Sequence, residues 1–255
     1  MEFLRRPADA NSLSTHGKYP AFRANSARVR PLARMNVVSE CLRIPAGSTA
    51  LDADLVIPEA ARGVVLFAHG SGSSRHSPRN RYVARELQRA GLATVLADLL
   101  TQAEEQADAR TGQLRFDIGM LGLRVTALTD WLAGHRATGS LPVGLFGAST
   151  GAAAALVAAA ARPSPVAAVV SRGGRPDLAG GHLRTVRQPT LLIVGELDTV
   201  VIGLSRAAMQ QLGGQARLEI VPGASHLFEE PGTLEQVARL ARDWLTRHLM
   251  PDRTE

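Results

Sequence analysis

The sequence predicts an α/β fold with a mainly parallel central sheet and helices on both of its faces. Short strand-like runs alternate with segments of helical periodicity along most of the chain. Some of these runs, such as residues 63–69 and 189–195, are almost continuously apolar, as expected of strands that helices cover on both sides. With 255 residues, 45% of them hydrophobic, the chain is long enough to bury one sizeable core.

The expected strands share apolar composition and flanking turn residues. They lie at residues 37–44, 48–57, 63–69, 92–98, 142–147, 166–171, 189–195 and 216–222. The first two should form a hairpin through a turn at residues 45–47. Because ligands bind at the carboxyl ends of strands in parallel sheets, the residues just after each strand are the candidates for function.

Helices are expected between these strands, where apolar residues recur at helical spacing. They should run from residue 78, over 116–134, through the alanine-rich run 152–161, after the strand at 189–195, and from about 233 to 249. Ser77 is a good N-cap and Pro78 suits the first helical position. Thr233 and Gln236 suit a capping box at the start of the last helix.

The formal net charge of +6 is concentrated at the amino terminus. Seven of the 29 basic side chains but only two of the 23 acidic ones lie in residues 1–35, so the rest of the chain carries 22 basic and 21 acidic side chains. This balance argues against a nucleic-acid-binding surface on the domain. If residues 1–35 themselves bound nucleic acid, binding should vanish on truncation to Met35 and fall steeply with salt.

Residues 1–35 show no helical or alternating periodicity, so we expect a disordered basic tail ahead of one domain over residues 36–255. Two interpretations are a start codon assigned too early, with Met35 as the first native residue, and a segment that is not native. No apolar run reaches the ~18 residues of a membrane-spanning helix. Cys41 is the single cysteine, which favours a reducing, cytoplasmic compartment.

The segment from Gly147 to Gly151 has the pattern G-x-S-x-G around Ser149, between a strand and a helix. A nucleophile at such a turn occupies strained backbone, and glycine two positions to either side relieves the crowding. The helix start also directs N–H groups and a positive dipole end at the serine. Taken alone, the pattern would equally suit a glycine-rich turn that caps a helix.

Two further residues make a nucleophile the better interpretation. His226 lies in the loop between the last strand and the last helix, where a general base for Ser149 would stand. Asp198 follows the preceding strand and could orient the imidazole, with Glu196 as the competing acid closer to the strand end. The chain order of serine, aspartate and histidine is the one that a nucleophile-elbow architecture imposes.

An oxyanion hole needs two backbone donors near Ser149. One would be the N–H of Thr150, which follows the nucleophile. The other should come from the small residues after the strand at 63–69, with Ser71 as first choice and Gly72 as second. We expect His69 to be a structural histidine packed beneath the site.

Four motifs, HGSGSSRHSPRN, FGASTG, VGELD and GASHLFEEPG, together resemble those of α/β-hydrolases of the dienelactone-hydrolase-like group. The resemblance covers about residues 43–249 and implies an α/β-hydrolase fold with the triad and oxyanion hole named above. The enzyme that gives the group its name uses a cysteine nucleophile, whereas Ser149 stands here and Cys41 lies on an early strand. Some relatives are joined to a phosphoribosyltransferase domain, which we do not expect in this sequence.

Residues around the predicted site suggest how substrate is held. Candidate substrate-binding residues are Gly72, Arg75, His76, Arg172 and Arg175. One or two of the charged side chains here, with Arg79 among them, could bind a carboxylate or phosphate. The alternative for the arginines is ion pairing with Asp177 or glutamates that fixes the loops. The connection over residues 171–190 is too short for a large cap domain, so the acidic segment 100–116 is the expected mobile cover.

These observations predict a cytoplasmic serine hydrolase, monomeric or homodimeric, that cleaves a small ester, thioester or lactone. The acyl substrate could be anionic, and no metal, organic cofactor, nucleic acid or membrane is expected as a partner. A non-hydrolytic receptor for a small ligand on the same fold is the alternative.

Overall fold

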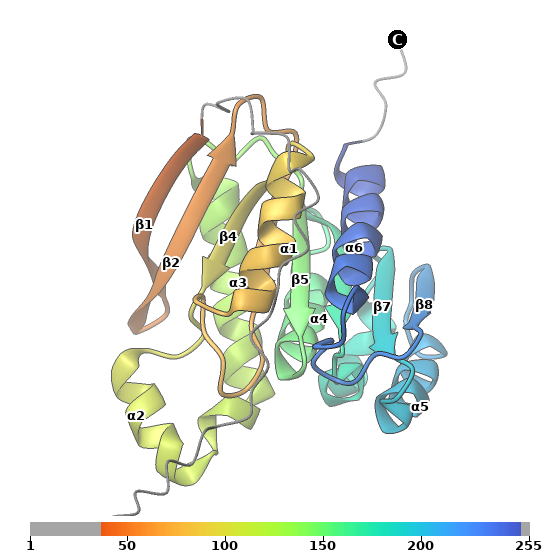
Figure 1. Cartoon of the computed structure of the whole chain (residues 1–255). Helices are drawn as coiled ribbons and strands as arrows, with labels where there is room; N and C mark the ends of the chain where they lie inside the picture. Colours follow the sequence, from red (N-terminus) through yellow and green to blue (C-terminus); the bar gives the residue numbers. More distant parts are fainter. Residues whose placement is uncertain (1–36, 251–255) are drawn as a thin grey trace, which may run out of the picture. The chain divides into compact units, whose positions relative to one another are not determined.

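Residues 37–250 contain one eight-stranded sheet in the order β1-β2-β4-β3-β5-β6-β7-β8 (Figure 1). The structure, a computed structural model, describes these residues, and the predicted tail over residues 1–35 lies outside them. The strands are β1 (Val37–Ala46), β2 (Thr49–Pro58), β3 (Val64–Ala68), β4 (Ala93–Ala97), β5 (Val143–Ala148), β6 (Val166–Arg172), β7 (Thr190–Gly195) and β8 (Ala216–Val221). All eight predicted strands are therefore present.

The sheet is parallel except at one edge. β1 pairs with β2 and β2 with β4 in antiparallel fashion, and the remaining neighbours are parallel. β3 and β5 lie side by side at the centre, and every residue of both strands is buried. The expected hairpin and the mainly parallel sheet are both confirmed.

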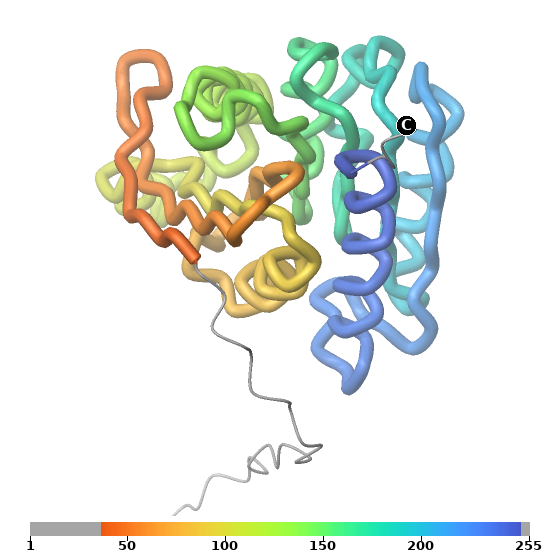
Figure 2. Tube along the Cα trace, turned by 90° about the horizontal axis from the view of Figure 1, so that it is seen from above, coloured from red at the N-terminus to blue at the C-terminus, as the bar shows by residue number. Residues whose placement is uncertain are grey.

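Helices cover both faces of the sheet. On one face α1 (Pro78–Arg89) and α6 (Thr233–Leu249) pack together over a core cluster that includes Phe67 and Phe146. On the other face α3 (Ile118–Gly134) and the alanine-rich α4 (Thr150–Ala161) pack closely, with α5 (Thr199–Met209) beyond them. Figure 2, seen from above, shows this separation of the helices into two layers.

The helix caps correct one prediction. Ser77 caps α1 as expected, because its hydroxyl accepts the Asn80 N–H at 3.3 Å. At α6 the predicted capping box is wrong. Gly232, in a left-handed conformation, is the N-cap, and Thr233 is the first helical residue. The Thr233 hydroxyl donates to the Glu230 carbonyl at 2.7 Å instead of accepting a helix N–H.

The strands are joined without a large inserted cap domain in the described part of the chain. The β6–β7 connection holds only the 3₁₀ helix η2 (Pro176–Thr185). Between β4 and α3 lie α2 (Gln102–Thr111) and the short 3₁₀ helix η1 (Leu114–Phe116), which correspond to the predicted cover.

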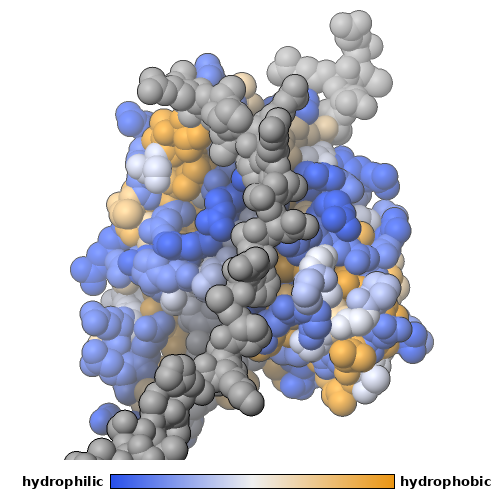
Figure 3. Space-filling view, viewed as in Figure 1, coloured by the Kyte–Doolittle hydropathy of each residue, from blue (hydrophilic) through white to orange (hydrophobic). Residues whose placement is uncertain are grey.

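The surface shown in Figure 3 is largely hydrophilic, with apolar areas over the β1–β2 hairpin and near α5. Exposed large hydrophobic side chains in these regions include Val37, Val38, Leu197 and Val200. Within residues 37–250, none of the helices combines the length and the apolar character that crossing a membrane requires.

Candidate active site

Ser149 stands at the sharp turn between β5 and α4. Its backbone has φ 49° and ψ −121°, a left-handed conformation that non-glycine residues seldom adopt. Such strain persists only where the surrounding structure enforces it, and it concentrates at functional sites. The backbone of Ser149 is held from both sides, because its N–H donates to the Arg172 carbonyl at 3.3 Å and its carbonyl accepts the Arg175 N–H at 3.0 Å.

The two glycines of the motif are required by close approach. A Cβ atom at Gly147 would lie 2.4 Å from Cα of Ala152, and one at Gly151 would lie 2.2 Å from the carbonyl oxygen of Ala68. Both contacts are with backbone that cannot swing away. The turn can therefore form only with glycine at both positions, as the motif predicts.

Asp198 and His226 are joined by a hydrogen bond of 2.6 Å between Oδ2 and Nδ1. Asp198 follows β7 and is also the N-cap of α5, where Oδ1 accepts the Val201 N–H at 3.5 Å. With Nδ1 donating to the carboxylate, Nε2 of His226 is the nitrogen free to accept a proton. The competing Glu196 accepts the Gly223 N–H at 2.7 Å and makes no contact with the imidazole among the described residues.

His226 reaches the elbow through the turn after β6. Gly173 has φ 49°, and a Cβ atom there would lie 3.0 Å from the carbonyl oxygen and 3.6 Å from Cε1 of His226. The residue before it, Arg172, accepts the Ser149 N–H. No hydrogen bond within residues 37–250 joins the Ser149 hydroxyl directly to His226. Such bonds are often long without substrate and tighten in the reacting complex.

The loop after β3 packs directly against Ser149. A Cβ atom at Gly70 would lie 2.9 Å from Cβ of Ser149. The Ser71 N–H, first choice for the second oxyanion donor, donates instead to the Thr150 hydroxyl at 3.0 Å. The Thr150 N–H is at the first position of α4, where a helix leaves its N–H groups without an internal partner.

His69 has the structural role expected from the sequence. It is buried, its Nε2 accepts the Leu99 N–H at 2.9 Å, and its Nδ1 lies 2.9 Å from the Gly70 carbonyl. Burial lowers the pKa of His69, although the Gly70 bond and the charge of Asp98 act in the opposite direction. Neutral His69 thus ties the end of β4 to the loop that carries Ser71.

A cavity of about 310 Å³ lies beside this loop. Its lining residues come from the loop after β3, the end of β4, the predicted cover and the starts of α3 and α4. They are His69, Gly70, Ser71, Gly72, Ser73, Ser74, Leu99, Leu100, Glu105, Asp108, Arg115, Leu121 and Thr150. Residues of the segment 100–116 therefore line one side of the cavity. Gly72, a predicted substrate-binding residue, also lines it.

Arg115 in this cavity was not among the residues predicted from the sequence. Its Nε and Nη2 bond to the carboxylate and the backbone carbonyl of Asp108, at 2.5 and 2.9 Å. Burial tends to raise the pKa of Asp108, but the bonds from Arg115 and from the Leu114 and Arg115 N–H groups lower it overall. The helical pattern around Asp108 is too polar to mark it as an inward-facing residue, which is why the pair escaped detection.

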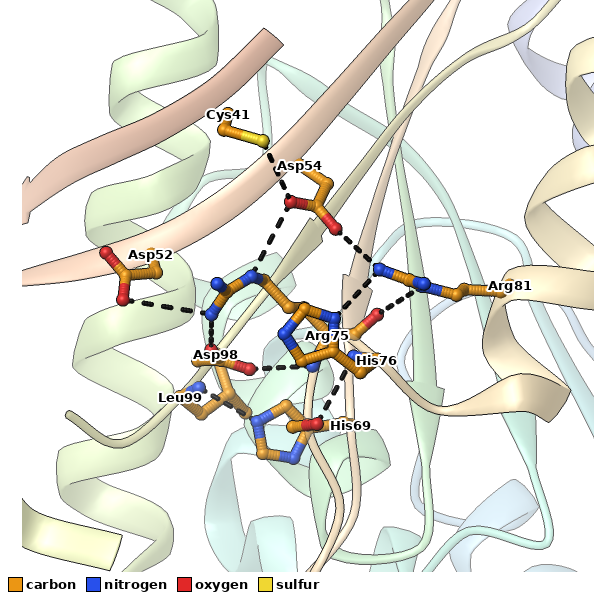
Figure 4. Close-up of polar contacts among 10 residues, drawn as sticks. Cys41, Asp52, Asp54, His69, Arg75, His76, Arg81, Asp98 and Leu99 are labelled. Atoms are coloured by element: carbon orange, nitrogen blue, oxygen red, sulfur yellow. Dashed lines mark hydrogen bonds and ion pairs between the residues drawn. The ribbon is translucent and has the colours of Figure 1, made fainter. Parts of the chain in front are cut away.

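Arg75 and His76 belong to a polar cluster that also includes His69 and Leu99 of the cavity lining, but neither of the two residues lines the cavity itself (Figure 4). The Arg75 N–H donates to Oδ1 of Asp98 at 2.6 Å, and its guanidinium faces three carboxylates. These belong to Asp98, Asp54 and Asp52. Nδ1 of His76 is 2.8 Å from Nη2 of Arg81. The arrangement corresponds to the alternative in which Arg75 fixes the loop by ion pairing.

The two arginines after β6 differ from each other. Arg175 is paired with Asp177 through two hydrogen bonds of 2.9 and 2.8 Å, which is again the loop-fixing alternative. Arg172 has no such partner among the described residues, and its Nε and Nη1 are buried without a hydrogen bond. Of the three arginines among the candidates for substrate binding, only Arg172 forms no ion pair with the described residues.

Known proteins resemble this chain in both sequence and fold. The family model described as alpha/beta hydrolase fold matches residues 63–216. The chain belongs to the α/β-hydrolase family. The chain is 58% identical to a dienelactone hydrolase from Anabaena variabilis, whose crystal structure superposes with a TM-score of 0.82 over 84% of this chain and 99% of that one. It is therefore a member of the dienelactone-hydrolase-like group, as its motifs predicted.

Other relatives add two facts. Proteins from two strains of Mycobacterium tuberculosis, provisionally named phosphoribosyl transferases, are 58% identical over 210 residues. The match covers 82% of this chain but 46% of each relative, so the chain spans about half their length. A lidless α/β serine hydrolase from Xanthomonas campestris, 23% identical with a TM-score of 0.65 over 87% of this chain and 99% of that one, shares the fold.

Proposed function

We propose that this hydrolase cleaves a small ester, thioester or lactone through an acyl-enzyme intermediate on Ser149. The observation that carries the proposal is the left-handed backbone of Ser149 at a strand-to-helix turn whose flanking glycines admit no side chain. The 2.6 Å bond between Asp198 and His226 supports it, because an oriented imidazole is what a serine hydroxyl needs as a base.

In the proposed reaction, Nε2 of His226 takes the proton of the Ser149 hydroxyl as Oγ bonds to the substrate carbonyl carbon. The oxyanion that forms is stabilised by the Thr150 N–H and by an N–H of the loop after β3. Collapse breaks the bond to the leaving oxygen or sulfur, which receives the proton from His226. Water then gives a proton to His226 and attacks the ester carbonyl of the acyl-enzyme. The bond between the acyl carbon and Oγ breaks, Oγ takes the proton back from His226, and the acid is released.

The cavity supports a neutral acyl group. Its lining carries two carboxylates, of Glu105 and Asp108, against the single guanidinium of Arg115. A formal balance of −1 disfavours an anionic group in this position. The cavity volume of about 310 Å³ is at the small end of ligand pockets, which supports a short acyl chain.

A fluorophosphonate probe tests the nucleophile. We expect it to label the wild-type protein once and to fail on Ser149→Ala, while Ser71→Ala, also beside the cavity, is labelled normally. A series of p-nitrophenyl esters should then show falling kcat/KM as the acyl chain outgrows the cavity. Labelling that survives in Ser149→Ala would end the proposal.

A non-hydrolytic receptor is the second candidate, and one observation favours it. The Ser71 N–H, the first-choice second donor of an oxyanion hole, is already used by the Thr150 hydroxyl. A receptor would bind esters with unchanged affinity in Ser149→Ala and would release no acid from them. Absence of labelling in the wild type, with binding retained, would support this alternative.

We also propose, from composition alone, a cytoplasmic protein that is monomeric or homodimeric and has no nucleic-acid or membrane partner. The near balance of acidic and basic residues beyond residue 35 supports the lack of a nucleic-acid partner. Light scattering at several protein concentrations would determine the oligomeric state.

A further inference from the structure

Arg172, the last residue of β6, is a buried arginine without a counter-ion. Its side chain is part of a residue only 8% exposed, and Nε and Nη1 have no hydrogen-bond partner within residues 37–250. Arg124 in α3 is equally buried, at 8%, but donates to both carboxylate oxygens of Glu104 and to the Leu99 carbonyl. The two arginines are therefore equally buried, but only Arg124 has an ion-pair partner among the described residues.

An aromatic ring and a second arginine lie near the guanidinium of Arg172. Its Cζ lies 5.9 Å from the centre of the Phe228 ring. Arg79, at the start of α1, is close enough for its charge to act on Arg172. Its Nη1 donates to the Glu229 carboxylate at 3.2 Å, and its Nε is buried without a partner. Burial, and to a smaller extent the charge of Arg79, lowers the pKa of Arg172 to about 10, so the side chain is still protonated at neutral pH.

A buried cation without hydrogen bonds is strongly unfavourable, and stacking on one aromatic ring offsets only part of the cost. Proteins retain such groups where a ligand completes them. Phe228 covers the guanidinium and is itself strained, with φ 55° for a bulky residue that is 2% exposed. A ligand would reach this face of the guanidinium only if Phe228 moved.

The position of Arg172 indicates which part of a substrate it would meet. Its carbonyl accepts the Ser149 N–H, and Phe228 lies two residues after His226. Because His226 protonates the leaving group, that part of the substrate must lie on the His226 side. The cavity beside the Ser71 loop, with its formal charge of −1, is left for the acyl group.

We propose that Arg172, assisted by Arg79, binds a carboxylate or phosphate carried by the leaving-group half of the substrate. A guanidinium suits both anions because it donates two parallel hydrogen bonds. The proposal rests on the serine hydrolase function proposed above. It assigns a neutral acyl group to the cavity and a negative charge to the alcohol or thiol that leaves.

Binding is tested first in the Ser149→Ala protein, where catalysis has no part. At constant ionic strength, we expect inorganic phosphate or acetate to raise Tm by about 2 °C or more, and Arg172→Met to abolish the shift. Without anion, Arg172→Met should have an unchanged or higher Tm, whereas the matched Arg124→Met should have a lower one. A lowered Tm in Arg172→Met with the anion shift intact would show that Arg172 only supports Phe228, and would overturn the proposal.

Specificity is tested with two chromogenic acetate esters that differ only in the leaving group. One is the ester of 4-nitrophenol and the other the ester of 5-hydroxy-2-nitrobenzoic acid, with acetylated 4-hydroxyphenyl phosphate as the phosphate arm. Arg172→Met should raise KM for the charged esters about tenfold and change KM for the neutral ester less than about twofold. In Arg172→Lys the increase in KM for the charged esters should be smaller. Arg162→Met, which removes an exposed arginine paired with Asp130, should change neither.

The outcomes separate this proposal from the proposed function. An equal effect of Arg172→Met on charged and neutral esters would reject the anion site but leave the nucleophile intact. Hydrolysis that survives in Ser149→Ala would reject the proposed function, while the anion-dependent Tm shift would still report on Arg172.

Discussion

The backbone N–H of Ser71 donates a 3.0 Å hydrogen bond to the side-chain hydroxyl of Thr150. This bond joins the loop after β3 to the first residue of α4, the two segments that carry the oxyanion donors predicted from the sequence. It holds the loop in place and at the same time uses one of the donors that the sequence suggested for catalysis. The Gly72 N–H, the second choice, takes part in no hydrogen bond given by the described residues, and Gly72 faces the cavity.

Replacement of Thr150 by valine tests the role of this bond. Valine keeps the shape but removes the hydroxyl, so the Ser71 loop loses its tie to the elbow. We expect kcat for p-nitrophenyl acetate to fall about tenfold with little change in KM, and Thr150→Ser to stay near the wild type. A rise in kcat in Thr150→Val would instead show that the hydroxyl competes with the oxyanion for the Ser71 N–H.

Asp198→Asn should reduce kcat by about 10³–10⁴-fold, because the amide favours the wrong imidazole tautomer. Asparagine still caps helices well, so the start of α5 should persist and Tm should change little. Glu196→Gln is the matched control, since Glu196 contacts Gly223 and not His226. Steady-state kinetics with one ester would distinguish the two acids, and equal losses in both variants would contradict the assignment.

Gly151→Ala should destabilise the protein by about 3 kcal/mol or more, because the new Cβ would meet the Ala68 carbonyl oxygen at 2.2 Å. Gly203→Ala in α5 is the control, with no atom within 4 Å of the added Cβ. There we expect a gain of about 0.5–1 kcal/mol from helix propensity. Urea unfolding of the two variants would measure both changes, and similar values would show that the elbow is less crowded than the structure indicates.

The cover over the cavity should respond to acid through Glu104. The hydrogen bond from Arg124, with further bonds at Thr101, lowers the pKa of Glu104 to about 2 from an ordinary value of 4.5. Since the native pKa is the lower one, the unfolded state binds more protons, and the stabilisation is complete above pH 4.5 and lost as pH falls through about 2.

Urea unfolding between pH 2 and pH 6 would check this dependence against Glu104→Gln. The stability advantage of the wild type over this variant should shrink as pH falls from about 5 to about 2. A constant difference across the range would show that the Arg124–Glu104 pair contributes nothing through its charge.

The strands and the elbow could be predicted because the physical constraints on them are local. Strands buried on both faces leave an apolar run, and Gly147 and Gly151 are required by backbone contacts that recur wherever a serine stands on such a turn. The same logic located Asp198 and His226, which follow strand ends. Their hydrogen bond joins loops 28 residues apart and could be expected from chain order alone.

The cover and its charges were harder to predict. α2 is polar on all sides and buries only Asp108, so its sequence shows no helical spacing of apolar residues. The signal that could have found it is the capping box at Thr101 and Glu104, the device that we placed wrongly at Thr233. Whether an arginine is paired depends on contacts from distant elements, which is why Arg75 and Arg172 looked alike in the sequence.

The two oxygens of the Asp198 carboxylate have different partners. Oδ1 accepts a hydrogen bond from the first turn of α5, and Oδ2 accepts one from the imidazole of His226. The helix therefore helps to fix the position of Asp198, and Asp198 orients the His226 ring before any ligand binds. If the acid moved to another strand during evolution, α5 would need a different N-cap residue.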